Sequence, residues 1–308
     1  FPTRRSSDLW KSALECIDAI KYRGHSVVYL QHEQDEVPSK YSWVEGVIGN
    51  RIFLTHPIER FTHLKFVQLT GAGYDHIPMS YIKKNNIKIY NASGVYSIPM
   101  AEYAVCGTLQ LYKKMCYFYK NKVSHKWDKN RNLQELDGKN VAIVGCGSVG
   151  TECAKRFRAF GCNIMGVDIV KIDGNYFNST FLIDSLDDLL EIIDVLILTV
   201  PLTSETHWLI NEYELKKMKS DAIIINISRG GVINTNALIQ ALDRLGGAVL
   251  DVFEEEPLEV TSPLWTKENV IITPHNSFVG ENNEKRLAKL IIDNLDLTIQ
   301  AEENHEYE

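Results

Sequence analysis

Apolar residues in the first third of the chain recur at two different spacings. Between residues 9 and 22 they return every three or four positions, which predicts an amphipathic helix. Short apolar runs follow, and they predict strands at residues 25–30, 43–49, 64–70 and 87–92. This alternation is typical of an α/β domain.

A second alternation occupies the rest of the chain. Residues 97–115 predict a long helix, with Pro99 in the first turn, where helices tolerate proline. After a polar stretch from residue 120 to 136, strands are predicted at residues 141–145, 163–168, 195–200, 222–228, 248–252 and 270–275. These strands are apolar throughout, which indicates a parallel sheet covered on both faces. A last helix, over about residues 282–300, is expected to return the chain to the first domain.

The first nine residues, FPTRRSSDL, have no apolar period and no starting Met. They resemble the translation of a common sequencing adapter, so we treat residues 1–9 as a non-native leader. Because the first predicted element is then a helix, we expect that the first strand of the domain was lost with the natural N-terminus. A paired central strand formed by residues 1–8 would contradict this expectation.

Composition narrows the classes of function. With 308 residues, 44% of them apolar, the chain is long enough to build two cores. The net charge of -7 comes from interspersed charges without a Lys/Arg block, which argues against nucleic acid and membrane surfaces as partners. No apolar run is long enough to span a bilayer. The six cysteines form no CxxC pair and have no histidine at ligand spacing, so we expect no metal, and reduced, mostly buried thiols in the cytoplasm.

Three glycines carry the pattern of a dinucleotide-binding turn. Gly145, Gly147 and Gly150 follow an apolar strand and precede a helix, which would allow a tight turn, a close approach of pyrophosphate and close helix packing. Asp168 ends the next strand, where a carboxylate can accept hydrogen bonds from the adenosine ribose hydroxyls and repels a 2'-phosphate. NAD is therefore expected over NADP, although nearby Lys171 leaves use of both open. The alternative is a glycine turn beside an unrelated surface aspartate.

Three polar residues at the ends of later strands suit hydride transfer at C2 of a hydroxy acid. Arg229 offers a planar fork for the substrate carboxylate and carbonyl oxygen. His275 can exchange a proton with the C2 oxygen near neutral pH, and Glu256 on the other ring nitrogen would orient the imidazole. Taken singly, the three could be a surface arginine, a solvated glutamate in an acidic run and an ordinary loop histidine.

At these residues the chain resembles the D-isomer-specific 2-hydroxyacid dehydrogenases, a phosphoglycerate dehydrogenase-like family. The matching stretches are QLTGAGYDHIP, SIPMAEYAV, VAIVGCGSVG, LTVPLTSETHWLI, AIIINISRGGVINTNALIQAL, GGAVLDVFEEEPL and NVIITPHNS. The resemblance implies an NAD-dependent oxidoreductase that interconverts a D-2-hydroxy acid and its 2-oxo acid. It also implies an α/β fold in which a Rossmann NAD-binding domain (residues 94–281) is inserted in a flavodoxin-like substrate-binding domain built from residues 10–93 and 282–308, and a homodimer.

The family pattern further implies individual roles. Arg229, Glu256 and His275 correspond to the active-site triad, and the backbone at Ala72 and Gly73 to the contact with the substrate carboxylate. Cofactor contacts are implied for Gly145, Gly147, Ser148, Val149, Gly150, Asp168, Val200, Pro201, Ile227 and Asp251. Asp251 is expected to accept from the nicotinamide carboxamide, with a loop-capping aspartate at a strand end as the alternative.

Some features leave other interpretations open. The chain departs from the family pattern at Asn234 and Asn276, neither of which touches the proposed chemistry. An NADH-sensing interaction protein similar to the C-terminal binding protein corepressors would keep the same fold and triad. A formate dehydrogenase relative is disfavoured, because that branch resembles a Gln at the position of Glu256. The sequence does not identify the substrate acid or the physiological direction of the reaction.

Overall fold

The computed structural model describes residues 13–37, 41–74 and 76–305, with side chains from residue 16 to 299. Contacts between residues divide the chain into two units. The terminal unit contains the described residues up to Val95 together with those from Gly280 onward, and the central unit runs from Tyr96 to Val279. The expectation of a missing first strand concerns residues 1–8, which lie outside the described residues.

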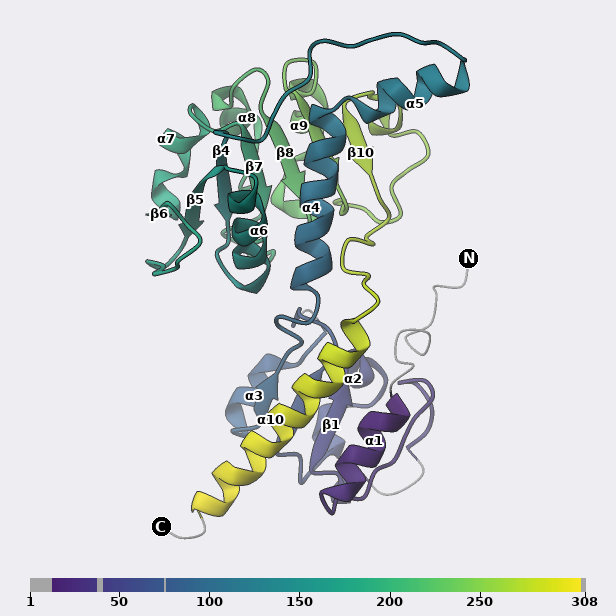
Figure 1. Cartoon of the computed structure of the whole chain (residues 1–308). Helices are drawn as coiled ribbons and strands as arrows, with labels where there is room; N and C mark the ends of the chain where they lie inside the picture. Colours follow the sequence, from purple (N-terminus) through teal and green to yellow (C-terminus); the bar gives the residue numbers. More distant parts are fainter. Residues whose placement is uncertain (1–12, 38–40, 75, 306–308) are drawn as a thin grey trace. The chain divides into compact units, whose positions relative to one another are not determined.

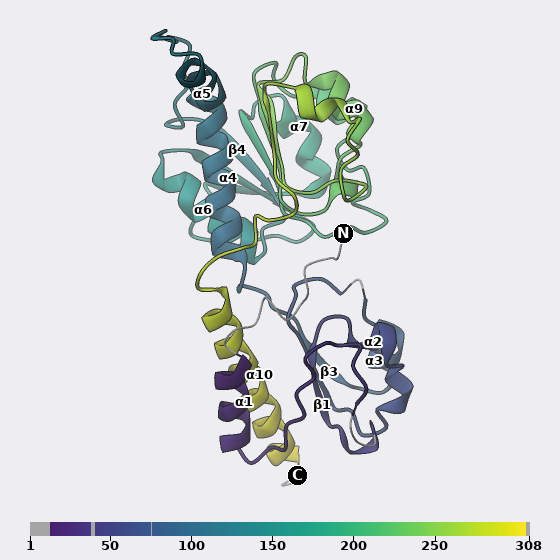
Figure 2. The same cartoon turned by 90° about the vertical axis from the view of Figure 1, so that its right-hand side faces the viewer.

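The terminal unit is built on a parallel sheet of three strands in the order β1-β2-β3. These strands are β1 (Gly46–Gly49), β2 (Phe66–Leu69) and β3 (Lys88–Tyr90), and the helices of the unit are α1 (Ala13–Tyr22), α2 (Ile52–Thr55), α3 (Met79–Lys84) and α10 (Asn283–His305). Helices α1 and α10 lie side by side (Figures 1 and 2). Arg23 next to α1 donates two hydrogen bonds to Asp296 of α10, at 2.6 and 2.9 Å. Both chain ends therefore contribute to one unit.

One predicted strand of the terminal unit is wrong. Residues 25–30 form no strand, although their sequence HSVVYL is apolar and β-branched. Val28 and Tyr29 are exposed, so the run is not packed as a sheet strand would be. A strand is stable only as part of a hydrogen-bonded ladder, and no described segment pairs with this run.

The central unit contains a parallel sheet of seven strands in the order β10-β9-β8-β7-β4-β5-β6. The strands are β4 (Asn140–Val144), β5 (Asn163–Asp168), β6 (Ser179–Leu182), β7 (Val195–Leu198), β8 (Ile223–Asn226), β9 (Gly247–Leu250) and β10 (Val270–Ile272). The chain builds outward from β4 in one direction and, from β7 on, in the other, which is the doubly wound arrangement. The edge strand β6 was not predicted, because its sequence STFL begins with two polar residues.

Helices cover both faces of the central sheet. They are α4 (Ser97–Tyr112), α5 (Met115–Val123), α6 (Ser148–Ala159), α7 (Leu186–Leu190), α8 (Glu212–Lys217) and α9 (Thr235–Ala241). Short 3₁₀ turns span Tyr41–Trp43, Ile58–Arg60, Ile183–Ser185, Gly230–Val232 and Pro263–Thr266. Helix α5 was missed as a separate element: the predicted helix of residues 97–115 stops at Tyr112, and Lys114 has a positive φ of 53° that separates α4 from α5.

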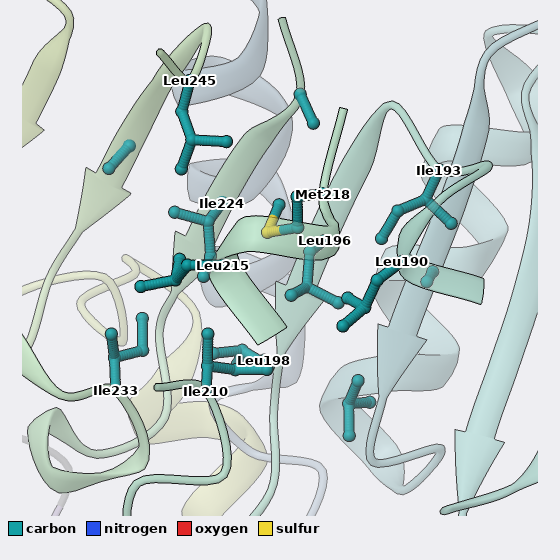
Figure 3. Packing of buried hydrophobic residues seen from close by; sticks show 14 of the residues in the cluster. Leu190, Ile193, Leu196, Leu198, Ile210, Leu215, Met218, Ile224, Ile233 and Leu245 are labelled. Atoms are coloured by element: carbon teal, nitrogen blue, oxygen red, sulfur yellow. The ribbon is translucent and has the colours of Figure 1, made fainter. Parts of the chain in front are cut away.

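Alternate residues of each central strand enter two different cores. Val141 and Ile143 pack with α4 and α6, whereas Ala142 and Val144 pack on the side of α7, α8 and α9. Figure 3 shows the second core, where Leu196 and Leu198 of β7 meet side chains from the covering helices. Burial on both faces explains why these strands are apolar throughout. Among the described helices, none combines the length and the low polarity needed to cross a bilayer.

Candidate functional site

The predicted site residues of the central unit follow the carboxyl ends of adjacent strands. Gly145, Gly147, Ser148, Val149 and Gly150 follow β4, Asp168 ends β5, Val200 and Pro201 follow β7, Ile227 and Arg229 follow β8, Asp251 and Glu256 follow β9, and His275 follows β10. Because all pairs in this sheet are parallel, these residues lie along one edge, where ligands of open α/β sheets bind.

The glycine turn has the geometry that a pyrophosphate requires. A Cβ at Gly150 would lie 2.0 Å from the carbonyl oxygen of Gly145, so only glycine allows this close packing of α6 on β4. Gly147 is the N-cap of α6 and offers no side-chain acceptor to the first-turn N–H groups. No atom lies within 4 Å of the Cβ position at Gly147, which leaves room for a ligand. The residues present therefore fit a dinucleotide phosphate at the helix N-terminus.

Asp168 is partly buried and tied to the glycine turn. Its Oδ2 accepts a hydrogen bond from the Cys146 backbone N–H at 2.7 Å, and its Oδ1 accepts from the Ile169 N–H at 2.7 Å. A carboxylate has about four acceptor sites, so these bonds leave capacity for ribose hydroxyls. The Cys146 thiol is buried, and burial followed by the nearby Asp168 charge raises the pKa of the thiol to about 12, so the thiol stays protonated in the turn.

Glu256 and His275 are brought into direct contact. The His275 Nδ1 lies 2.9 Å from the Glu256 Oε2, while the Glu256 Oε1 accepts from the Phe253 N–H at 3.1 Å. Both side chains are about 40% exposed, at 41% for His275 and 38% for Glu256. One ring nitrogen of His275 is thus held by Glu256, and both side chains keep exposed surface.

Arg229 lies in the turn that follows the neighbouring strand β8. Its Nη1 donates to the Ser228 carbonyl oxygen at 2.8 Å, and its own carbonyl oxygen accepts from the Asn226 side chain at 2.9 Å. A Cβ at Gly230 would lie 1.8 Å from the Phe253 carbonyl carbon, so the turn after β8 and the loop that carries Glu256 touch backbone to backbone. The sequence offers only the double glycine after Arg229 as a signal of this contact.

Asp251 follows β9 and accepts hydrogen bonds from the loop that carries His275. It is 0% exposed, its Oδ1 accepts from the Asn276 N–H at 2.7 Å, and its Oδ2 accepts from the Ser277 N–H at 2.9 Å. Its carboxylate therefore organises the loop that carries His275, as the loop-capping alternative requires. The contact with the nicotinamide carboxamide stays a prediction.

Ala72 and Gly73 belong to the terminal unit, where they follow β2. The Ala72 carbonyl oxygen accepts from the Asn91 side chain at 2.7 Å, so a residue after β3 holds this loop. The Glu33 carboxylate accepts from the backbone N–H groups of Asn50 and Arg51, both at 2.6 Å. Asn91 and Glu33 were not predicted to hold these loops, because polar residues in loops carry no signal of their partners.

Other kinds of site are not seen in the part of the chain that the structure describes. There, no group of three or more His, Cys, Asp or Glu side chains is placed to hold a metal ion. All six cysteines are free; Cys106 and Cys116 are exposed and the other four are buried, in line with the expectation of mostly buried thiols.

A family model and curated relatives agree on the kind of protein that this chain resembles. Residues 105–277 match the family model described as D-isomer specific 2-hydroxyacid dehydrogenase, NAD binding domain. A glyoxylate reductase of Thermofilum pendens is 36% identical over 250 residues, which are 78% of this chain and 73% of that protein. A hydroxypyruvate reductase of Blautia hydrogenotrophica is 30% identical over 301 residues, 93% of this chain and 91% of that protein.

A solved structure extends the similarity over both units. D-lactate dehydrogenase from Aquifex aeolicus, complexed with NAD and lactic acid, superposes with a TM-score of 0.75 at 26% identity. The match covers 94% of this chain and 93% of that one.

Proposed function

The chain belongs to the D-isomer-specific 2-hydroxyacid dehydrogenase family, an NAD-dependent class of enzymes, and we propose that it interconverts a D-2-hydroxy acid and its 2-oxo acid with His275 as the acid/base. The observation that carries this proposal is the 2.9 Å contact between the His275 Nδ1 and the Glu256 Oε2. It occupies one ring nitrogen and leaves the Nε2 for the substrate.

Oxidation of the hydroxy acid needs one acceptor for the proton of the C2 hydroxyl and another for the hydride on C2. When bound, NAD takes the hydride from C2 of the hydroxy acid and NADH returns it to the 2-oxo acid. In the oxidation, the His275 Nε2 removes the proton of the C2 hydroxyl, and a C=O bond forms as the hydride leaves C2. In the reduction, His275 gives that proton to the oxygen. Glu256 stabilises the imidazolium that exists between the two events.

The remaining roles concern the position of the substrate. We assign the substrate carboxylate and the C2 oxygen to the guanidinium of Arg229, whose fork can hold both oxygens. For the backbone at Ala72 and Gly73 we propose the contact with the substrate carboxylate that the family pattern implies.

The relatives suggest which acids to test first. Glyoxylate reductase and hydroxypyruvate reductase are named for small 2-oxo acids, so we propose a small 2-oxo acid as substrate. NADH oxidation with glyoxylate, hydroxypyruvate, pyruvate, branched 2-oxo acids and 3-phosphohydroxypyruvate would rank them by kcat/KM.

Replacement of His275 tests the proposal directly. In His275→Ala, turnover should fall by roughly a hundredfold or more, because general acid/base catalysis contributes about that much. NADH binding, followed by its fluorescence, should stay within about twofold of the parent chain, because the glycine turn is untouched. His63→Ala removes an exposed histidine of the terminal unit and serves as the control. Full activity in His275→Ala would refute the assigned role.

We also propose that the active form is a homodimer. Helices α4 and α6 carry an open groove of about 720 Å³ on their outer side, lined by apolar side chains that include Val105, Leu109 and Phe160. Its rim holds both signs of charge, with Glu102 3.4 Å from Arg156. A surface that combines apolar side chains with side chains of both charge signs can be complementary to itself across a two-fold axis. We therefore propose that a second copy of this chain binds in the groove.

A further inference from the structure

A chain of hydrogen bonds links helix α4 to the loop that carries His275. The Tyr103 hydroxyl lies 2.6 Å from the Thr273 Oγ1, and the Thr273 hydroxyl donates to the Asp251 Oδ1 at 2.5 Å. Tyr103 and Thr273 are 170 residues apart in the sequence. All three residues belong to the central unit, so the chain of bonds lies inside one unit.

The direction of each bond follows from the chemistry of the groups. An ionised carboxylate only accepts, so the single proton of Thr273 is used on Asp251. The Thr273 oxygen then accepts from Tyr103, whose hydroxyl must be the donor. Burial raises the pKa of Tyr103, so its hydroxyl keeps the proton that this bond requires.

Asp251 connects this chain of hydrogen bonds to the backbone of the loop that carries His275. The Asp251 carbonyl oxygen accepts from the His275 N–H at 2.7 Å, while its carboxylate accepts from the next two backbone N–H groups. His275 itself has a positive φ of 50°, a conformation that disfavours a residue with a Cβ by about 1 kcal/mol or more. The bonds from Asp251 hold the loop in this conformation, which in turn sets where the imidazole meets Glu256.

We propose that Tyr103 is a positioning residue for His275, acting through Thr273 and Asp251. The inference rests on the proposed role of His275. Tyr103 reaches the loop from helix α4 through its hydroxyl oxygen. Packing alone does not need this oxygen, since a phenylalanine ring would fill the same space. Its hydroxyl thus holds the Thr273 hydroxyl, which donates to the Asp251 Oδ1, and the same oxygen accepts from the Asn276 N–H of the catalytic loop.

The same helix offers a matched control. Tyr103 is partly buried, whereas Tyr112 of α4 is buried, at 2% exposed, and its hydroxyl has no hydrogen-bond partner among the described residues. Tyr103→Phe and Tyr112→Phe therefore remove the same atom from the same helix, and only the first breaks the chain of bonds.

The test compares four variants of the full chain. Tyr103→Phe and Thr273→Val should each lower kcat by roughly three- to tenfold, about the value of one lost hydrogen bond. The NADH dissociation constant should change by less than about twofold, because the bonds act on the loop and not on the glycine turn. Thr273→Ser keeps the hydroxyl and should recover most of the lost kcat, and Tyr112→Phe should match the parent chain.

The pH profile of kcat separates positioning from stability. Glu256 and Asp251 both contact the His275 loop, and a displaced loop weakens the support of the imidazolium by Glu256. In the direction of reduction, which needs the protonated imidazole, the basic limb of the profile should move to lower pH in Tyr103→Phe. A variant that is only less stable would show a lower Tm with an unmoved profile.

The outcomes are distinguishable from those of the proposed function. If Tyr103→Phe and Thr273→Val keep the parent kcat and profile while His275→Ala is inactive, the positioning role is wrong and the proposed function stands. If the two variants lose NADH affinity with unchanged kcat, the chain of bonds serves the cofactor and the inference is also wrong. Activity in His275→Ala would remove the premise itself. In a double-mutant cycle, Tyr103→Phe combined with Thr273→Val should cost no more than Thr273→Val alone, since both act in one chain.

Discussion

At the scale of single residues, the site contains three carboxylates that lie at the carboxyl ends of strands but have different partners and different exposure. Asp168, Asp251 and Glu256 all follow or end strands of one sheet. Asp251 is fully buried and bonded to a loop, Glu256 is partly exposed and faces an imidazole, and Asp168 is tied to a backbone turn with acceptor capacity left. Exposure and bonding, which the sequence does not state, decide which of them can meet a ligand.

Asp168 should make the enzyme prefer NADH to NADPH. A 2'-phosphate beside this carboxylate would place like charges close together, at a cost of about 1 to 4 kcal/mol, so kcat/KM for NADH should exceed that for NADPH by roughly tenfold or more. Asp168→Asn should narrow the ratio, and Asp173→Asn, an exposed change in the loop that follows, should not. Equal kcat/KM values with the two cofactors in the parent chain would remove the case for Asp168.

At the scale of elements, the strand β4, the glycine turn and the helix α6 form the part of the structure that is most completely determined by local sequence. Two of its glycines act in different ways: Gly150 permits close packing of α6 on β4, whereas Gly147 leaves open space around its Cβ position. Experiments can separate these two roles, because close packing at Gly150 affects the stability of the fold and open space at Gly147 affects ligand binding.

Alanine at these two glycines should give opposite results. Gly150→Ala forces a Cβ against the Gly145 carbonyl oxygen, so the free energy of unfolding should fall by about 1 to 3 kcal/mol or more, measured by urea denaturation. Gly147 has a negative φ of -68° and open space around its Cβ position. In Gly147→Ala the free energy of unfolding should therefore be unchanged, while NADH binding weakens. A Gly147→Ala variant that binds NADH as the parent chain does would contradict phosphate binding at this turn.

At the scale of the whole molecule, the reactivity of the thiols depends on their burial and on the oligomeric state of the protein. Burial raises the pKa of Cys146 and Cys153 to about 12, and that of Cys16 and Cys162 to about 11, so these thiols are almost entirely protonated at neutral pH and shielded from reagents. Cys106 and Cys116 are exposed, and Cys106 lines the groove on α4 and α6.

Thiol labelling should therefore follow the oligomeric state. In the proposed dimer, Cys116 should react quickly with a disulfide reagent and Cys106 slowly, with the site of labelling read by mass spectrometry. Met115→Glu places a charge in the groove and should yield monomers by light scattering, in which Cys106 reacts quickly. A parent chain that is monomeric at micromolar concentration, with both thiols equally reactive, would contradict the homodimer.

The sequence by itself determined the parts of this protein that follow from local chemistry. Apolar runs placed β4, β5, β7, β8, β9 and β10, because strands buried on both faces cannot be polar. The glycine turn and the residues after each strand then placed Arg229, Glu256 and His275 on one edge, because parallel strands end on the same side.

Only the tertiary structure decided what depends on partners distant in the sequence. Residues 25–30 are apolar yet form no strand, and STFL is half polar yet pairs as β6, because a ladder needs a neighbour and not only propensity. Likewise Asp251 faces the His275 loop, and Tyr103 meets Thr273 across 170 residues. Hydrogen bonds of this kind form where the fold brings two groups within about 3 Å, a condition that no spacing along the chain encodes.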